Sequence, residues 1–380
     1  MSRISVIGSG FIAKGFINLL YDHPNYILEK ILTRTGIEKR SDFPHNDHMT
    51  NDLDELIANS DLIVECTGDA IYACETISRI LEASIPVVTM NSEFHVTVGS
   101  YFIDKGLLTE AEGDQPGVLA MLHEEAIAMG FKPLVYGNIK GFLNHDPTLE
   151  EMQYWGKRSG ISLDMVTSFT DGTKVNIEQA LVANGLHASI VQDGLMGLSD
   201  DNMNHGGNIL AEKAKELGYP ISDYLLSPKL PAGVFLAVEH NENQKDALHY
   251  YKMGDGPYYI LERTFHLCHL EMMKTVDRVL RGGGVLLDNS TDPTISVTTI
   301  AKRNLKPGET IKKGIGSFDV RGIAVKIKEH KGHVPIGLMK DAVIKRPVSE
   351  GSELTFEDVE LPESLAVQVW KSIEKKVFEG

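Results

Sequence analysis

The sequence predicts an α/β protein that begins with a doubly wound parallel sheet and continues into a central α+β region and a β-rich C-terminal module. Three observations lead to this fold class. A glycine turn joins a strand to a helix within residues 4–16, strands and helices alternate through the first hundred residues, and Lys, Thr, Val and Ile become frequent near the C-terminus. Alternation of strands and helices is typical of parallel sheets, and β-branched residues favour strands.

Length and composition describe a globular chain with more than one core. At 380 residues we expect two or three domains, and 42% hydrophobic with 24% charged residues excludes a disordered protein. The net charge of −16 argues against a nucleic-acid or anionic-membrane partner, but a few local cations suffice for an anionic substrate. With no membrane-length apolar run, no signal peptide and three unpaired cysteines, we expect a reduced, cytoplasmic protein.

The first motif is Gly8-x-Gly10-x-x-Ala13, placed between a short apolar strand and an amphipathic helix. Gly8 permits a tight turn, Gly10 lets the backbone approach a pyrophosphate, and Ala13 permits close packing of helix and strand. The structural alternative is a glycine loop that only joins two buried elements. We predict a Rossmann-type dinucleotide site whose first contacts are Gly8, Ser9, Gly10, Phe11 and Ile12.

The next elements continue the same pattern. Strands are predicted at 26–33, 61–68 and 85–90, helices at about 70–83 and 97–110, and a last helix–strand unit at 116–140. Cofactor contacts in such sheets gather at the carboxyl ends of the strands. We therefore add Thr67, Gly68, Asn91 and Ser92 to the predicted cofactor site.

The end of the second strand indicates which cofactor binds. Sites that prefer NAD usually carry Asp or Glu there, whereas this chain has Thr33-Arg34-Thr35. The planar fork of Arg34 suits a 2′-phosphate. The alternative is a solvent-exposed loop arginine. We expect NADP(H).

The segment 172–184 has the pattern of a buried helix, yet Lys174 lies in its first turn, where the helix dipole disfavours a cation. Lys174 and Glu178 are one turn apart and are expected to project into one cleft. A lysine partly desolvated beside a carboxylate can polarise a carbonyl and donate a proton. Otherwise they form an exposed ion pair worth less than about 1 kcal/mol. Asp171, Lys174 and Glu178 are the candidate catalytic residues.

Two further segments carry candidate substrate contacts. Lys140, Asn144 and His145 follow a strand end, although Asn144 also suits a plain surface turn. His266 and His269 are three apart and would share one face of a helix. Two histidines are too few for a zinc site, so we predict no metal site. A divalent ion such as Mg²⁺ could still chelate a hydroxyketone through oxygen ligands like Asp171 or Glu178, although no spacing motif calls for it. A buried helix with satisfied histidines is the alternative reading.

Several long strings resemble one family. They include NSEFHVTVG, GNIKGFLNHD, FTDGTKVNIEQALVANG and GDGPYYILERTFHLCHLE. They are similar to strings found in one family of proteins. Members of that family resemble 1-deoxy-D-xylulose 5-phosphate reductoisomerase, but they have the architecture of homoserine dehydrogenase. Thr89 and Asn91 match the homoserine dehydrogenase strand end, where Ser92 replaces that family's lysine. Asp171 with Lys174 resembles its Asp–Lys pair at slightly different spacing.

The C-terminal part contains a weak repeat. Residues 300–314 and 343–358 share a strand, a basic pair, a turn glycine and a threonine-bearing extended exit. These paired half-motifs resemble a SAF-type β-clip. The predicted domains are a Rossmann domain at 1–138, a substrate and dimerisation domain at 139–292, the SAF-like module at 293–362 and a C-terminal helix at 363–380.

The resemblance implies a homodimeric NADPH-dependent enzyme that reduces a small, phosphorylated or otherwise anionic carbonyl compound in a reductoisomerase-like reaction. Two alternatives stay open. One is a dehydrogenase of the homoserine type without isomerisation. The other is a non-catalytic NADP-binding sensor that uses its C-terminal module to bind a partner.

Overall fold

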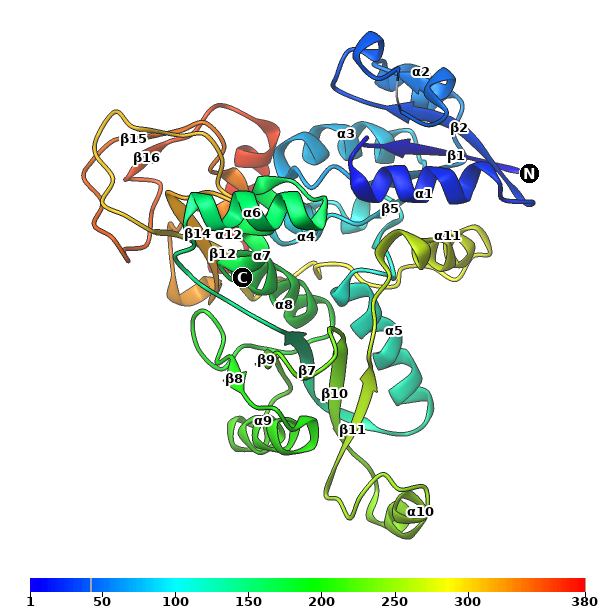
Figure 1. Cartoon of the computed structure of the whole chain (residues 1–380), viewed down its shortest axis with the longest axis vertical. Coiled ribbons are helices and arrows are strands. Elements are labelled where there is room, and N and C mark those ends of the chain that lie inside the picture. Colours follow the sequence, from blue (N-terminus) through cyan, green and yellow to red (C-terminus); the bar gives the residue numbers. More distant parts are fainter. Residues whose placement is uncertain (42, 380) are drawn as a thin grey trace.

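The computed structural model describes residues 1–41 and 43–379, and Figure 1 shows how its parts are arranged. The N-terminal part is a six-stranded parallel sheet with strand order β3-β2-β1-β4-β5-β6. Its strands are β1 (Ser2–Ile7), β2 (Tyr26–Leu32), β3 (Met49–Thr50), β4 (Leu62–Glu65), β5 (Val87–Thr89) and β6 (Leu108–Glu110). The order reverses between β1 and β4, which is where Rossmann-type sheets bind dinucleotides. The predicted fold class is confirmed.

Helices cover both faces of this sheet because successive strand residues point to opposite sides. Ile63 packs in the layer of α3, whereas Leu62 and Val64 pack in the layer of α1 and α11. Met272 of α11 belongs to that second layer, so a helix from the middle of the chain completes the N-terminal core. The helices named here are α1 (Phe11–Tyr21), α3 (Ala70–Glu82), α4 (Ser92–Val98) and α11 (Met272–Leu280).

Two predicted elements are wrong. The helix expected at 97–110 is replaced by the end of α4, two 3₁₀ turns and strand β6, which at three residues is too short to show a period. The strand expected to end the first sheet, β7 (Lys132–Lys140), lies in the second sheet. An apolar run predicts a buried strand, but it does not tell which sheet receives it.

The second sheet is mixed and has the order β11-β10-β7-β9-β8. Its other strands are β8 (Leu198–Ser199), β9 (Ile221–Leu226), β10 (Val234–Glu239) and β11 (Tyr258–Arg263). Helices α5 (Gln115–Ala128) and α8 (Thr173–Gly185) pack on one face, and α9 (Met203–Leu217) packs on the other. Central strand β7 therefore carries its end, Asn138 to Lys140, toward α8.

The C-terminal module contains a β12–β14 ladder and a small three-stranded sheet, β13-β15-β16. The strands are β12 (Ile295–Ala301), β13 (Thr310–Ile311), β14 (Val320–Lys326), β15 (Ala342–Ile344) and β16 (Val359–Glu360). The two repeat segments pair with each other, since Leu305 and Val348 exchange backbone hydrogen bonds of 2.9 and 3.1 Å. Helix α12 (Leu365–Glu379) returns to α3 and α4 and buries Val369, Trp370 and Ile373.

The predicted domain boundaries stay a prediction, and the last residue of the predicted C-terminal helix, Gly380, lies outside the described residues. Over residues 1–41 and 43–379, no helix combines the length and apolar character that crossing a bilayer requires.

Candidate active site

Helix α8 is the element that organises the site. It is buried on nearly every side, from Thr173 to Asn184. One face lies on β14, where the Thr173 hydroxyl accepts a hydrogen bond from the Gly322 amide and Asn176 accepts one from the Ala324 amide. The helical periodicity then directs Lys174 and Glu178 to the opposite face, toward α4, α5 and the end of β7. The predicted helix is confirmed.

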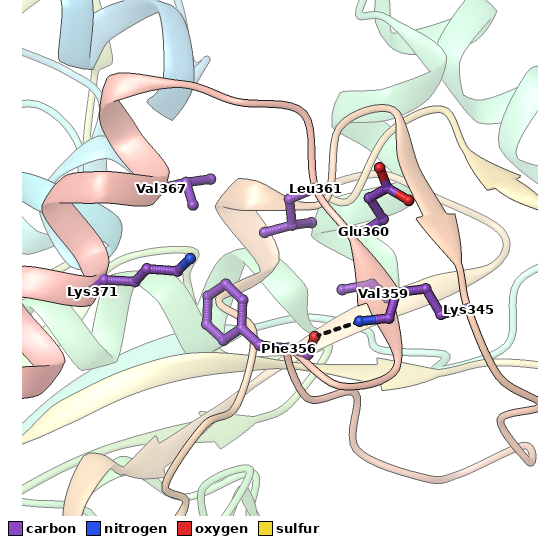
Figure 2. A pocket seen from close by; sticks show the side chains of 7 residues that line it. All are labelled: Lys345, Phe356, Val359, Glu360, Leu361, Val367 and Lys371. Atoms are coloured by element: carbon purple, nitrogen blue, oxygen red, sulfur yellow. Dashed lines mark hydrogen bonds between the residues drawn. The ribbon is translucent and has the colours of Figure 1, made fainter.

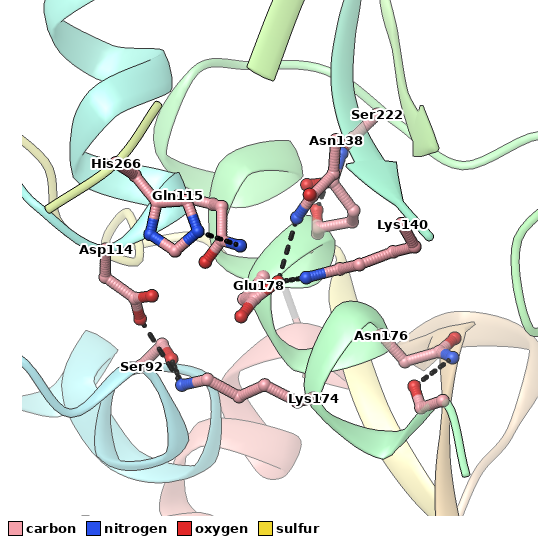
Figure 3. A network of polar contacts seen from close by, with 12 residues as sticks. Ser92, Asp114, Gln115, Asn138, Lys140, Lys174, Asn176, Glu178, Ser222 and His266 are labelled. Atoms are coloured by element: carbon pink, nitrogen blue, oxygen red, sulfur yellow. Dashed lines mark hydrogen bonds and ion pairs between the residues drawn. The ribbon is translucent and has the colours of Figure 1, made fainter. Parts of the chain in front are cut away.

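Lys174 lies among acidic side chains at the carboxyl end of β5. Its Nζ donates to Ser92 Oγ at 2.8 Å and to Glu93 Oε1 at 3.0 Å, and it lies 3.3 Å from Asp114 Oδ2. Only 8% of the residue is exposed. Figure 3 shows the ammonium pointing to Ser92 and Asp114. Two carboxylates therefore offset the cost of burying this cation.

These charges fix the protonation states. Burial opposes the charged form of Lys174, but Asp114 and Glu93 outweigh it, and the pKa of Lys174 is raised well above its ordinary value. Burial likewise disfavours the Asp114 carboxylate, yet Lys174, His266 and Lys140 lower the pKa of Asp114. At neutral pH the site thus holds an ammonium ion that has a proton to give.

Glu178 organises the second half of the same polar region. Its Oε2 accepts from Asn138 Nδ2 and from Lys140 Nζ, both at 2.8 Å, and the residue is 1% exposed. Lys140 is thereby held at the end of β7, with its ammonium directed into the site (Figure 3).

Gln115 joins the two halves. In the amide orientation that satisfies both of its ends, its nitrogen donates to Glu178 Oε1 at 3.2 Å and to Asp114 Oδ1 at 2.9 Å. Its oxygen accepts from Lys140 Nζ at 3.3 Å and from His266 Nε2 at 3.1 Å. We refer to the connected set as the Lys174 cluster; it comprises Ser92, Glu93, Asp114, Gln115, Asn138, Lys140, Lys174, Glu178 and His266.

Asp171, the third candidate catalytic residue, does not join this cluster. Its Oδ1 accepts from the Thr173 amide at 2.9 Å, and its Oδ2 pairs with Lys302 Nζ at 3.1 Å. The carboxylate therefore starts α8 and binds the C-terminal module. Asp171 and Lys174, which resemble the Asp and Lys of homoserine dehydrogenases, thus have different partners: Asp171 binds Lys302, and Lys174 binds Glu93 and Asp114.

The loop after β7 divides its predicted substrate residues. Lys140 enters the Lys174 cluster, whereas Asn144 closes a turn in which its Oδ1 accepts from the Asp146 amide at 3.1 Å. His145 lies beside Gly172 instead, with its Nε2 3.4 Å from the position that a Cβ on that glycine would take. Of the three residues, only Lys140 is brought to Lys174.

His266 and His269 do not share a helical face. The segment after β11 is a loop that ends in a 3₁₀ turn at Cys268–Leu270, and Cys268 has a positive φ of 41°. His266 reaches Gln115, whereas the ring of His269 lies 6.0 Å from that of Phe11 in α1. The expected helix is wrong because the loop is held against Gly113. The Cys268 amide donates a hydrogen bond to the Gly113 carbonyl oxygen at 3.0 Å.

The glycine turn fits a dinucleotide. Gly8 has a φ of 122°, and a Cβ there would lie 3.0 Å from the Cys66 carbonyl oxygen, so the fold itself requires this glycine. At Gly10 a Cβ would meet nothing within 4 Å. The missing side chain at Gly10 therefore leaves the start of α1 uncovered, as a pyrophosphate at a helix N-terminus requires.

Glu65 is a buried carboxylate that fixes the neighbouring strand ends. It accepts hydrogen bonds from the side chains of Thr67, Thr89 (2.9 Å) and Asn91 (3.0 Å). Burial raises the pKa of Glu65 although these hydrogen bonds oppose the rise. Glu65 thus orients Thr67 and Asn91, which are both predicted to contact the cofactor. Ser92, the next residue along the chain, accepts the hydrogen bond from Lys174.

Two arginines flank the turn. Arg34 Nη1 pairs with Asp69 Oδ2 at 2.7 Å, and its guanidinium lies 4.5 Å above the Tyr72 ring centre. Arg40 Nη2 donates to Ser9 Oγ at 2.9 Å. Two guanidinium groups therefore lie beside the end of β2, that of Arg34 in an ion pair with Asp69, where the ribose of a bound dinucleotide lies in this fold.

A separate pocket of about 420 Å³ lies in the C-terminal module (Figure 2). Its wall combines apolar side chains with Lys345, Glu360 and Lys371, and Lys345 Nζ donates to the Phe356 carbonyl at 3.4 Å. It shares no residue with the Lys174 cluster. Across the described residues 1–41 and 43–379, no group of three or more His, Cys, Asp or Glu side chains is arranged to hold a metal ion.

Two segments of the chain match known families. Residues 8–98 match the homoserine dehydrogenase NAD-binding domain, and residues 113–272 match the catalytic domain of oxidoreductase DRL. The chain is therefore a nicotinamide-dependent oxidoreductase. The second match contains Asp114, Gln115, Lys140, Lys174, Glu178 and His266. It argues against the non-catalytic sensor.

Other comparisons add little. No curated protein matches the chain. Among solved structures, UDP-N-acetylglucosamine 3-dehydrogenase from Acidithiobacillus ferrooxidans aligns at 12% identity and a TM-score of 0.43, covering 76% of this chain and 92% of its own. Scyllo-inositol dehydrogenase from Lactobacillus casei, solved with NAD(H), aligns at 11% and 0.39, covering 74% and 89%. Because these TM-scores are below 0.5, we base no conclusion on them.

Proposed function

We propose that this oxidoreductase uses NADPH to reduce a small, anionic carbonyl compound, with Lys174 as the proton donor. The position of Lys174 carries the proposal. Its ammonium is buried and hydrogen-bonded to Ser92, directly after β5, and strand ends on this side of the sheet face the cofactor.

The chemistry assigned to the chain is proton transfer and substrate positioning. When bound, the dihydronicotinamide supplies the hydride. The Lys174 ammonium hydrogen-bonds to the substrate oxygen and gives it a proton as that oxygen becomes a hydroxyl. Glu93 and Asp114 hold the ammonium in place and keep it charged. A positioned general acid of this kind accelerates a reaction by about 10² to 10⁴.

Lys140 and His266 are the proposed substrate contacts. Both side chains reach Gln115, which bridges Glu178 and Asp114, the partner of Lys174, so a molecule bound at Lys174 would lie near both of them. Glu178 keeps Lys140 in position through the 2.8 Å ion pair.

We favour a reductoisomerase-like reaction, in which a phosphorylated ketose is isomerised and the resulting aldehyde is reduced. The sequence resemblance supports this version. The site offers a carboxylate, Glu178, to accept a hydroxyl proton and an ammonium, Lys174, to donate one, and isomerisation of a hydroxyketone needs both. The alternative is a homoserine-type dehydrogenase that only reduces a semialdehyde.

An assay of NADPH oxidation separates these reactions. Consumption with a phosphorylated ketose and formation of a branched polyol phosphate is the expected result. Consumption only with a semialdehyde favours the homoserine-type reaction. If no member of a broad carbonyl panel is reduced, the proposed activity is wrong.

The preference for NADPH is also part of the proposal, and the positions of Arg34 and Arg40 support it. We expect Arg34→Leu to weaken NADPH binding by about tenfold to a hundredfold, since hydrogen bonds to charged groups contribute about 1.5–3 kcal/mol. NADH binding should barely change. Fluorescence titration of both cofactors into both proteins measures the ratio, and a wild-type preference for NADH contradicts the assignment.

The homodimer implied by the resemblance completes the proposal. Analytical ultracentrifugation of the full chain tests it, with a monomer at micromolar concentration as the contrary result.

A further inference from the structure

The C-terminal module reaches the first sheet through one lysine. Lys340 follows a 3₁₀ turn at Ile336–Leu338, which lies between β14 and β15. Its Nζ lies 3.2 Å from Asp69 Oδ2, although 271 positions separate the two residues in the chain. Asp69 follows β4 and caps α3, where its Oδ1 accepts a hydrogen bond from the Tyr72 amide at 3.1 Å. The module therefore contacts the edge of the sheet at which a cofactor is expected.

Packing fixes the position of Lys340. The 3₁₀ turn that precedes it lies against α3 and α4. A Cβ at Gly337 would lie 2.3 Å from the hydroxyl oxygen of Thr97 in α4, so the absence of a side chain permits this close approach. Leu338 and Met339 are both buried. Because the residues directly before Lys340 are held in the core, the chain presents this lysine at the start of α3.

Arg34 shares its carboxylate with Lys340. It lies just after β2, and its Nη1 is 2.7 Å from the same oxygen of Asp69, Oδ2. Among these three groups, two cations face one carboxylate, and one positive charge is left in excess. The side chains of Arg34 and Lys340 are 49% and 47% exposed, so a ligand can approach both from solvent.

The excess positive charge favours a phosphate group over a hydroxyl group. The ribose next to the adenine of a bound dinucleotide lies beside the end of β2 in this fold, where Arg34 is placed. A 2′-phosphate on that ribose would meet a guanidinium from the first sheet and an ammonium from the C-terminal module. The guanidinium can bind phosphate bidentately, and the ammonium adds a compact second charge. The neutral 2′-hydroxyl of NAD gains much less from a second cation.

We propose that Lys340 determines cofactor specificity from the C-terminal module, by binding the 2′-phosphate of NADPH together with Arg34. The inference rests on the proposed function, which names NADPH as the cofactor. It gives the C-terminal module a task that its β-clip pattern does not reveal, because the module supplies a contact of the cofactor site. Lys340 acts on cofactor binding, whereas proton transfer stays with Lys174.

The first test measures binding of two cofactor fragments. Adenosine 2′,5′-bisphosphate carries the 2′-phosphate, and adenosine 5′-monophosphate lacks it. Both are titrated calorimetrically into the full chain. We expect the wild type to bind the bisphosphate at least tenfold more tightly than the monophosphate. Lys340→Met should weaken bisphosphate binding by about tenfold, because charge-assisted hydrogen bonds are among the strong ones, and should leave monophosphate binding within about twofold of wild type.

Two further variants separate the charge of Lys340 from its part in the structure. Lys340→Arg keeps the positive charge and should retain most of the affinity for the bisphosphate. Lys312→Met is the matched control, since it removes a surface lysine of the same module that pairs with Asp341, and it should bind both fragments as the wild type does. A Lys340→Met variant that lost affinity for both fragments equally would have a structural defect, and this result overturns the proposal.

Unchanged bisphosphate binding in Lys340→Met also overturns it. The second test titrates NADPH and NADH into the wild type and into Lys340→Met, and we expect the variant to lose most of the preference for NADPH. A wild type that prefers NADH contradicts the proposed cofactor itself. A wild type that prefers NADPH, with the same ratio of Kd values in Lys340→Met, contradicts only the role of Lys340.

Discussion

Two buried lysines lie near the start of α8 and differ in what surrounds them. Lys302 pairs with Asp171 before the start of α8 and also donates a hydrogen bond to the Ser317 carbonyl. Lys174, in the first turn of α8, faces two carboxylates and the hydroxyl of Ser92. The Lys302 side chain is 2% exposed, and the Lys174 side chain is 10% exposed.

The difference shows that burial and ion pairing alone do not identify a catalytic lysine. Lys302 has one carboxylate for one ammonium, in contact with the C-terminal module, as a structural pair requires. Lys174 has an excess of negative charge around it and lies at the strand ends where sheets of this kind bind their cofactor. We therefore expect the two lysines to respond differently to the same substitution.

Lys174→Met should have the largest effect on activity. Loss of the proton donor should lower kcat by about 10² to 10⁴, since this is the usual contribution of a general acid. NADPH binding, followed by fluorescence, should be retained. Unchanged turnover would refute the assignment of Lys174.

Lys302→Met should act on stability instead. Removal of one partner from a buried ion pair leaves Asp171 uncompensated and commonly costs about 3–5 kcal/mol of unfolding free energy. Denaturant unfolding measures this loss, and kcat per folded molecule should stay close to the wild-type value. If Lys302→Met lost turnover but not stability, the roles assigned to Lys302 and Lys174 would be reversed.

Asp114→Asn should have the smallest effect, and we expect this effect in the pH dependence of kcat/KM. Burial favours neutral Lys174, and Asp114 is the main charge that opposes it and raises the pKa of Lys174. Without that charge the pKa falls, so the protonated donor is lost at lower pH. The alkaline limb of the kcat/KM profile should therefore move to lower pH.

A matched control for this prediction is Asp341→Asn, which removes a surface carboxylate paired with Lys312. Its alkaline limb should coincide with that of the wild type. If the alkaline limb of the Asp114→Asn variant stayed at the wild-type position, Asp114 would not set the charge of Lys174.

The sequence was most informative where one motif has one structural solution. The glycine turn, the helix that carries Lys174 and the pairing of the C-terminal repeats follow from local residue patterns. The position of β7 in the second sheet does not follow from its residues, because an apolar run is compatible with either sheet. The helix predicted for His266 and His269 also failed, since the chain there must pass over Gly113.

The site was predicted only in part for a similar reason. Lys174, Glu178, Lys140 and His266 meet as expected, but their partners come from distant positions. Asp114 stands before Gln115 and Pro116 at the start of a helix and resembles an ordinary cap; only the fold shows that its side chain turns to Lys174 instead. Glu65, a carboxylate within an apolar strand, is a signal of this polar edge that is visible in the sequence.

The most direct test of the central claim is a crystal structure with NADP⁺ and a non-reacting substrate analogue. We predict Lys174 Nζ within hydrogen-bonding distance, about 2.6–3.2 Å, of the analogue's oxygen that corresponds to the carbonyl. That oxygen should lie beside C4 of the nicotinamide. A structure in which the ammonium keeps only its present partners, while the analogue binds elsewhere against the nicotinamide, would contradict the account.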